Sequence, residues 1–248
     1  MFKLIGIFIA VLLMTVKINA QVKYDFVSVF SELISPPVNC EEASVLFPLD
    51  SNQKMVSAGI NITEQETKLV KIQTEITNAL NAFKSSTEMP KLPPGAGPPG
   101  GMPPKDGGIN SDVISDVKEI MDKRIKASEN ITINMNIYKK EILKNQEELN
   151  IKLKKTKQTE EDKRLEYVNE FLTNTKTIYD KNYSIILKNV TDMVNTFNKD
   201  KNSAESKIPF LKTGMLKFES ELITTALLLF KITKQISEAG SMFYYGLK

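Results

Sequence analysis

The sequence contains no histidine, and this absence excludes several kinds of active site. Without an imidazole, a chain of 248 residues cannot build a Ser-His-Asp or Cys-His arrangement, a histidine general base or an ordinary zinc site. Glycine-rich phosphate-binding motifs and paired-cysteine motifs are also missing. Acidic residues number 30, but they are scattered at the density of exposed helix faces. We therefore expect no catalytic residue, no metal site and no cofactor, and we do not expect an enzyme.

Cysteine is nearly absent as well, since the only one is Cys40, in the segment SPPVNCEEASVLFP. A lone thiol cannot form a disulfide within its own chain. Two alternatives remain open. Cys40 is either a buried small hydrophobe or the site of an intermolecular disulfide, which would make a second copy of the chain a candidate partner. No basic residue flanks Cys40 to activate the thiol, which argues against a reactive nucleophile.

Long apolar runs are missing except at the amino terminus. There a basic residue precedes an apolar run of 13 residues, Leu4 to Val16, and the small residue Ala20 follows. The run is shorter than the ~20 residues that a membrane-spanning helix needs. This arrangement is typical of a signal peptide at residues 1–20, cleaved after Ala20, although Lys17 and Ile18 depart from the usual pattern and leave a retained anchor as the alternative. We expect a protein of the secretory pathway, extracellular and without a transmembrane span after cleavage.

The chain carries little excess of either charge. Removal of residues 1–20 takes away Lys3 and Lys17 and no acidic residue, so 33 basic residues become 31 against 30 acidic ones, and the net charge falls from +3 to +1. One dense basic cluster is followed within a turn by acidic residues and contains no aromatic residue for stacking on bases. It comprises Lys152, Lys154, Lys155 and Lys157. We interpret it as a solvated helix face and expect no nucleic-acid partner.

Proline and glycine are scarce outside one segment. Seven of the eleven prolines and six of the eleven glycines lie between Met89 and Gly108. The glycines there do not recur at every third position, which excludes a collagen triple helix. We therefore predict a flexible Pro/Gly-rich linker at residues 89–110. The next proline is Pro209, and such a long stretch without proline favours helices.

Apolar residues on both sides of the linker repeat with helical spacing. Before the linker, steps of three and four predict an amphipathic helix at residues 61–88, and Thr63 with Glu66 resembles a capping box at its start. After the linker, two rows with seven-residue spacing and a third row predict a helical bundle region at residues 111–248, with helices at about 111–154, 160–200 and 204–245. The predicted fold class is all-α: an antiparallel helical bundle with coiled-coil-like hairpins.

Two stretches interrupt this helical pattern. Across residues 154–164 the two seven-residue rows are out of phase, and the segment KKTKQTEEDKR contains nothing apolar. We favour a hairpin turn there, with Thr159 and Asp162 as a new helix cap, over one continuous helix. Residues 21–60 are expected to be irregular with one short helix at Phe26 to Leu33, because three prolines follow it.

Four Asn-X-Ser/Thr sequons are candidates for N-glycosylation. An asparagine-rich chain that is also rich in serine and threonine produces about this many by chance, so their number carries no weight. They begin at Asn61, Asn130, Asn182 and Asn189.

These features favour a secreted helical protein with a protein-binding or structural role outside the cell, whose partner the sequence does not identify. The alternative is a carrier of lipid or another hydrophobic ligand, or a lipid-surface binder, built from amphipathic helices. Most of the predicted helices have narrow apolar seams, which favour packing against protein. The segment Leu222–Ile232 is apolar on more than one face and suits either a buried helix or a lipid contact.

Overall fold

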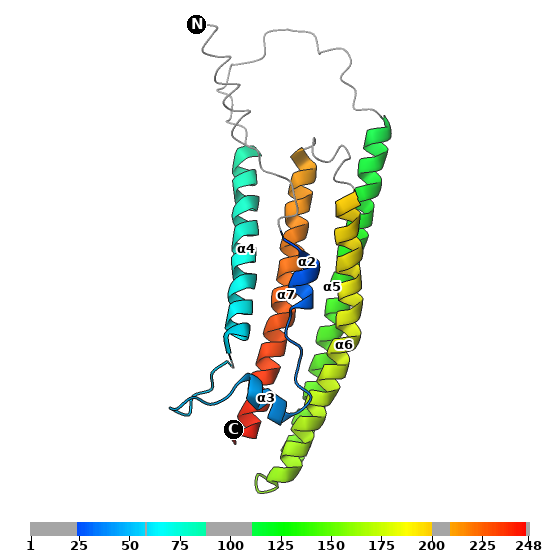
Figure 1. The fold of residues 1–248 in the computed structure, drawn as a ribbon. Helices are drawn as coiled ribbons and strands as arrows, with labels where there is room; N and C mark the ends of the chain where they lie inside the picture. The colour runs from blue at the N-terminus through cyan, green and yellow to red at the C-terminus, as the bar shows by residue number, and fades with distance from the viewer. Residues whose placement is uncertain (1–23, 58, 88–110, 200–208, 247–248) are drawn as a thin grey trace, which may run out of the picture.

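A computed structural model describes residues 24–57, 59–87, 111–199 and 209–246. In these residues all regular structure is helical, apart from one isolated antiparallel bridge between Leu49 and Met55. The described residues form two short helices and four long ones, arranged as in Figure 1, which confirms the predicted all-α helical bundle. The predicted signal peptide (1–20) and linker (89–110) lie outside the described residues. The helices are α2 (Phe26–Ser31), α3 (Cys40–Leu46), α4 (Gly59–Thr87), α5 (Ser111–Lys155), α6 (Glu161–Lys199) and α7 (Pro209–Tyr244).

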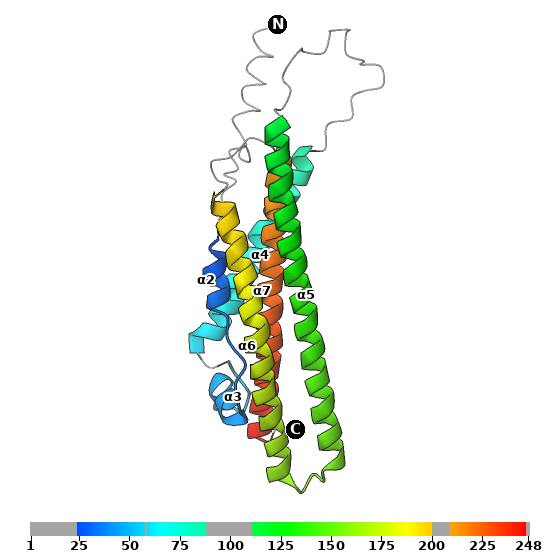
Figure 2. The same cartoon turned by 90° about the vertical axis from the view of Figure 1, so that its right-hand side faces the viewer.

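The last helix, α7, lies in the middle of the bundle. Successive long helices run antiparallel, with α4 on one side of α7 and the hairpin of α5 and α6 on the other (Figure 1). α7 packs mainly against α3 and α4 and less extensively against α6. α5 packs mainly against α6 and touches α7 only lightly, so it forms an edge of the bundle (Figure 2). One long side of α5 is therefore left uncovered.

α7 is central because it is apolar on two faces. Leu222 and Leu229 belong to one buried row, and Ile223 and Phe230 belong to a second row that is also fully buried. Most apolar residues of the segment Leu222–Ile232, which suited two interpretations from sequence alone, are therefore buried inside the bundle, whereas Thr224 and Lys231 remain exposed. At about 25 cal/mol per Å² of apolar surface removed from water, burying a helix on two faces stabilises the bundle more than burying a single seam.

Near its carboxyl end α7 carries small residues at the buried positions. Extending the seven-residue spacing of the seam would place Ala239 in the core, but Ala239 is exposed and Gly240 is buried instead. The α-helix repeats every 3.6 residues rather than 3.5, so the buried row shifts along a long helix. A Cβ atom on Gly240 would lie 2.9 Å from Ala43 Cβ and 3.0 Å from Leu172 Cδ1. Glycine at this position allows α3 and α6 to approach α7 closely.

α5 and α6 form a hairpin whose apolar rows meet as the seven-residue spacing predicts. The buried side chains of α5 include Ile131, Met135 and Ile142, and those of α6 include Leu172 and Ile186. Two buried polar residues, Arg124 and Asn145, interrupt the apolar rows in the described part of α5. Asn145, 7% exposed, donates through Nδ2 to the Phe171 carbonyl and to Thr175 Oγ1, both at 2.9 Å. A buried amide whose two N–H groups are both bonded favours one alignment of the two helices over others.

The turn between α5 and α6 forms at residues 156–160, within the predicted interruption. It contains neither glycine nor proline, and its own side chains close it. Thr156 Oγ1 donates to the Lys152 carbonyl at 2.8 Å, and Glu160 Oε2 accepts from the Lys157 amide at 2.9 Å. The predicted cap at Thr159 and Asp162 is wrong by one residue: α6 begins at Glu161, so Glu160 precedes the helix.

Residues 24–57 contain two short helices, whereas the sequence predicted one. The missed helix, α3, begins after Asn39, whose Oδ1 accepts from the Glu42 amide at 2.8 Å. The Glu42 carboxylate in turn accepts from the Val38 amide at 3.1 Å. This reciprocal pair resembles a capping box and is readable in the sequence, but the helix of 7 residues is too short for an apolar period to show.

The capping box predicted at Thr63 and Glu66 is also wrong, because α4 begins four residues earlier at Gly59. Ile62 is 2% exposed, seven residues before Leu69, and extends the buried seam of α4 by two turns. Burial of this side chain favours a longer helix over a start at Thr63. Glu66 instead pairs with Lys234 of α7, Oε2 to Nζ at 2.7 Å.

The long helices provide hydrogen-bond partners for the irregular backbone around α2 and α3. From α6, Tyr183 Oη donates to the Phe30 carbonyl at 2.6 Å and Thr173 Oγ1 donates to the Val38 carbonyl at 2.8 Å. From α7, Ser241 Oγ donates to the carbonyl of Phe47. Because a buried backbone group without a partner costs about 1–3 kcal/mol, these bonds fix residues 24–57 along the long helices.

We predict that Gly240→Ala destabilises the protein. Replacing glycine by alanine inside an exposed helix normally stabilises by about 1 kcal/mol, but here the new methyl group would clash with Ala43 and Leu172. We expect a loss of about 1–3 kcal/mol in the free energy of unfolding, measured by chemical denaturation. The control is Thr224→Ala, at an exposed position of α7, which should change it by less than about 0.5 kcal/mol. A Gly240→Ala variant at least as stable as the unmodified protein would mean that α3 does not pack this closely.

Candidate functional site

The acidic side chains that the structure describes form no metal centre. No group of three or more His, Cys, Asp or Glu residues in these parts of the chain is arranged to hold a metal ion. Among the same residues, the carboxyl groups with shifted pKa values are all shifted downward. A hydrogen bond from Lys68 lowers the pKa of Glu32, and hydrogen bonds from Lys181 and Asn182 lower that of Glu141. These carboxylates are ion-pair partners at neutral pH and do not resemble the raised-pKa acid of a hydrolase.

Cys40 is the first residue of α3 and is buried, with 1% of its surface exposed. Its backbone amide donates to Asn169 Oδ1 of α6 at 2.8 Å. Burial raises the pKa of the thiol to about 11, so the thiol is protonated at neutral pH. The thiol is free. Of the two alternatives left open by the sequence, this position favours the buried free thiol, because an intermolecular disulfide would require α3 to leave its site.

Three tyrosines pack together where α2, α5 and α6 meet. Tyr138 lies edge-on to Tyr179 with ring centroids 6.1 Å apart, and Tyr179 stacks on Tyr183 at 5.1 Å. Burial raises the pKa of all three phenols. Thr233 lies near enough to oppose the pKa shift of Tyr138, but the hydroxyl groups of Tyr138 and Thr233 have no hydrogen-bond partner among the described residues. We interpret this cluster as core packing that joins the amino-terminal segment to the hairpin.

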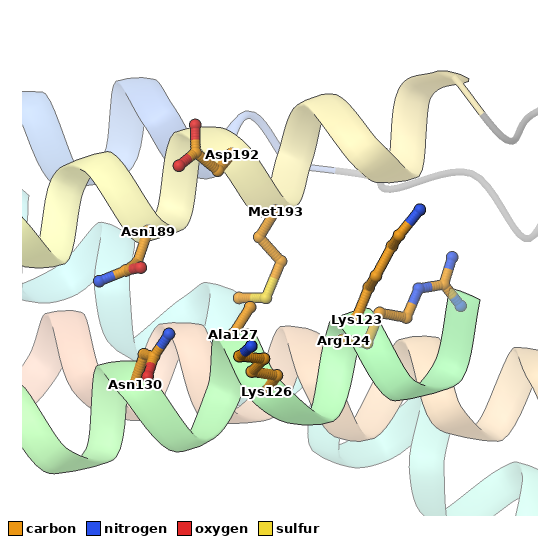
Figure 3. A pocket seen from close by; sticks show the side chains of 8 residues that line it. All are labelled: Lys123, Arg124, Lys126, Ala127, Asn130, Asn189, Asp192 and Met193. Atoms are coloured by element: carbon orange, nitrogen blue, oxygen red, sulfur yellow. The ribbon is translucent and has the colours of Figure 1, made fainter. Parts of the chain in front are cut away.

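A shallow groove of about 230 Å³ lies between α5 and α6 near the end of the hairpin opposite its turn (Figure 3). Lys123 and Arg124 stand at one end of it, and Asn130 and Asn189 point toward each other at the other end. Basic and acidic groups are mixed here, because Asp192 also lines the groove and accepts from Lys188 at 2.8 Å. Lys123, Arg124 and Lys126 outnumber Asp192 among the lining residues, so the groove is more basic than acidic.

The predicted glycosylation sites differ sharply in their surroundings. Asn130 is exposed on α5 and Asn189 is partly exposed on α6, and both line the groove. Asn182 is 1% exposed and lies in the contact between α5 and α6. The side chain of Asn61 lies outside the described residues. The sequons alone did not separate these positions, because a three-residue motif carries no information about burial.

The uncovered side of α5 carries five large apolar residues that are 41% to 58% exposed. At about 100° per residue they fall within about a third of the helix circumference, away from the buried row. We call them the α5 outer patch. The sequence analysis did not identify this patch, because the seven-residue rows that predict α5 lie on its opposite, buried face. The patch comprises Ile125, Ile133, Ile137, Leu143 and Ile151.

The described helices include none with both the length and the apolar character to cross a bilayer.

We predict that the Cys40 thiol is protected in the folded protein. At pH 8 a thiol with a pKa of about 11 has about a hundredfold less thiolate than one with the ordinary value of 9.0, and burial slows attack further. Labelling by a thiol-reactive dye should be at least about a hundredfold slower in the native protein than in denaturant. Equal rates, or a dimer on a non-reducing gel, would contradict the buried free thiol.

The same burial predicts a loss of stability at high pH. The unfolded chain releases the thiol proton near pH 9.0 and the folded chain releases it at about 11, so unfolding is favoured as the pH rises through this window. Below the window the contribution of the thiol to stability is fully present. We expect the free energy of unfolding of the unmodified protein to fall more steeply between these pH values than that of Cys40→Ala. Parallel curves for the two proteins would show that the thiol is solvated in the fold.

Comparison of the chain with family models, with curated proteins and with solved structures finds no match.

Proposed function

We propose that this protein is a secreted helical factor that binds another protein through the α5 outer patch. The observation that carries the proposal is the exposure of five large apolar side chains on one side of a single helix. Apolar residues exposed singly are ordinary on any protein surface, but a row of them along one face is typical of an interaction surface. Ile133 and Ile137 are one turn apart and form its centre.

Charged residues of both signs lie among the apolar residues of the patch, which supports a protein partner. Lys126, Glu129, Lys144 and Glu147 are exposed on the same face of α5, between the five apolar side chains. Protein interfaces combine apolar contacts with polar ones in this way. Helices that lie on lipid instead have wide apolar faces bordered mainly by Lys and Arg.

The alternative, a lipid carrier or lipid-surface binder, is supported less well. The sequence feature that favoured it was the segment Leu222–Ile232, which is apolar on more than one face. In the bundle this segment packs against other helices, with Ile223 and Phe230 at 0% exposure. A helix buried in this way offers no surface to lipid unless the bundle opens.

Native mass spectrometry of the protein secreted from eukaryotic cells distinguishes the two proposals. After removal of glycans we expect the mass of the polypeptide alone, since a protein-binding factor has no need of a bound lipid. A persistent added mass of lipid size would favour the carrier. The same sample tests secretion, because we expect the mature chain to begin at Gln21, after cleavage at Ala20. A chain that stays with the cell membrane and still begins at Met1 would favour the retained anchor.

The patch itself is tested by the double variant Ile133→Lys, Ile137→Lys. Both side chains are exposed, so we expect unchanged thermal unfolding. Partners are first identified by chemical cross-linking in the extracellular fluid where the protein occurs, and affinity is then measured with the purified partner. We expect the double variant to bind at least about tenfold more weakly, because two charges would be buried in the interface.

The matched control is Val70→Lys, an exposed apolar position on α4, 45% exposed. It should bind as the unmodified protein does. Equal affinity of the double variant and the unmodified protein would show that the α5 outer patch is not the binding surface.

A further inference from the structure

The hydrogen bonds of each sequon amide distinguish the three glycosylation candidates whose side chains the structure describes. An asparagine Nδ2 carries two hydrogens. Asn182 uses both, donating to Glu141 Oε2 at 2.7 Å and to the Ile178 carbonyl at 2.9 Å. Asn189 uses one, donating to the Ile185 carbonyl at 2.9 Å. Asn130 is exposed, and its side-chain amide makes no hydrogen bond within the part of the chain that the structure describes.

N-glycosylation consumes one of these hydrogens. In the transfer from a polyprenyl-pyrophosphate oligosaccharide, Nδ2 forms a bond to C1 of the first sugar. The bond from C1 to the pyrophosphate oxygen breaks, the lipid pyrophosphate leaves with the electron pair, and the amide releases one proton. One N–H remains on the modified side chain. Asn130 and Asn189 can therefore accept a sugar and keep every hydrogen bond described for them, whereas Asn182 would lose one of two.

The space around the three amides also separates Asn130 and Asn189 from Asn182. Asn130 and Asn189 open on one end of the groove of about 230 Å³ between α5 and α6, and Ala127 and Met193 lie between this pair and Lys123 and Arg124 (Figure 3). This groove is open to solvent, so a sugar can extend outward from either side chain. Asn182 is 1% exposed against Glu141 of α5, and a sugar there would separate the two helices.

We propose that Asn130 and Asn189 are a pair of N-glycosylation sites on the two sides of one groove, and that Asn182 is never glycosylated in the folded protein. A chain that received a sugar on Asn182 during synthesis could not pack α6 against α5. Such a chain would remain misfolded, so the secreted population has an unmodified Asn182. The inference rests on the proposed passage of the protein through the secretory pathway.

The test uses the full chain, secreted from eukaryotic cells with its own amino terminus. Peptide N-glycosidase removes each glycan in heavy-oxygen water and converts the glycosylated asparagine to a labelled aspartate, which peptide mass spectrometry assigns to a position. We expect the label at residues 130 and 189 and an unlabelled asparagine at 182. The single variants Asn130→Gln and Asn189→Gln should each lose one glycan on a gel and be secreted as well as the unmodified protein.

Three results would overturn the inference. They are a label at position 182, an unlabelled Asn130 or an unlabelled Asn189 in secreted protein. Each of these leaves the proposed secretion intact, because the protein has reached the medium. A chain that stays in the cytosol and begins at Met1 would instead refute both the secretion and the glycosylation.

Discussion

Burial of α7 on two faces is the constraint on which the rest of this bundle depends. A helix with a single apolar seam needs one neighbour, but α7 has a second row, through Ile223 and Phe230, that must also be removed from water. Among the long helices, α4 and α6 cover part of α7, and α5 adds little because it packs mainly against α6. The long helices therefore do not enclose α7 by themselves. The short helices α2 and α3 and the segment between them cover what remains. The irregular amino-terminal segment is therefore part of the core and not an appendage.

Polar groups in this core act mainly by fixing alignment. Asn145 and Asn182 each bond across the contact between α5 and α6, one to the backbone and a threonine of α6, the other to Glu141. Apolar rows with a seven-residue period can slide past one another by one repeat at modest cost. A buried amide whose bonds exist in only one alignment makes such a slide unfavourable. The two asparagines thus limit the hairpin to one register.

The long helices could be predicted from the sequence because their evidence is periodic and repeated over many turns. The rows through Met135 and Ile186 fall inside the bundle as their spacing indicates. Short-range features were predicted less well. α3 has too few residues to show a period, and the start of α4 depends on the burial of Ile62 rather than on the capping pattern at Thr63. Asn182 looked like any other sequon, because its partner Glu141 lies 41 positions away in the sequence.

The contact of α3 with the end of α7 joins the first and last parts of the described chain. Ser241 bonds to the carbonyl of Phe47 across 194 positions, and Ala43 lies against Gly240. During synthesis the amino-terminal segment emerges long before the helix that covers it. Phe47, which is buried in the finished bundle and lies beside Ser241, stays exposed until α7 has been synthesised. The protein therefore has a long interval in which a chaperone that shields apolar residues would prevent aggregation, and its folding is expected to be slow for a helical bundle of this size.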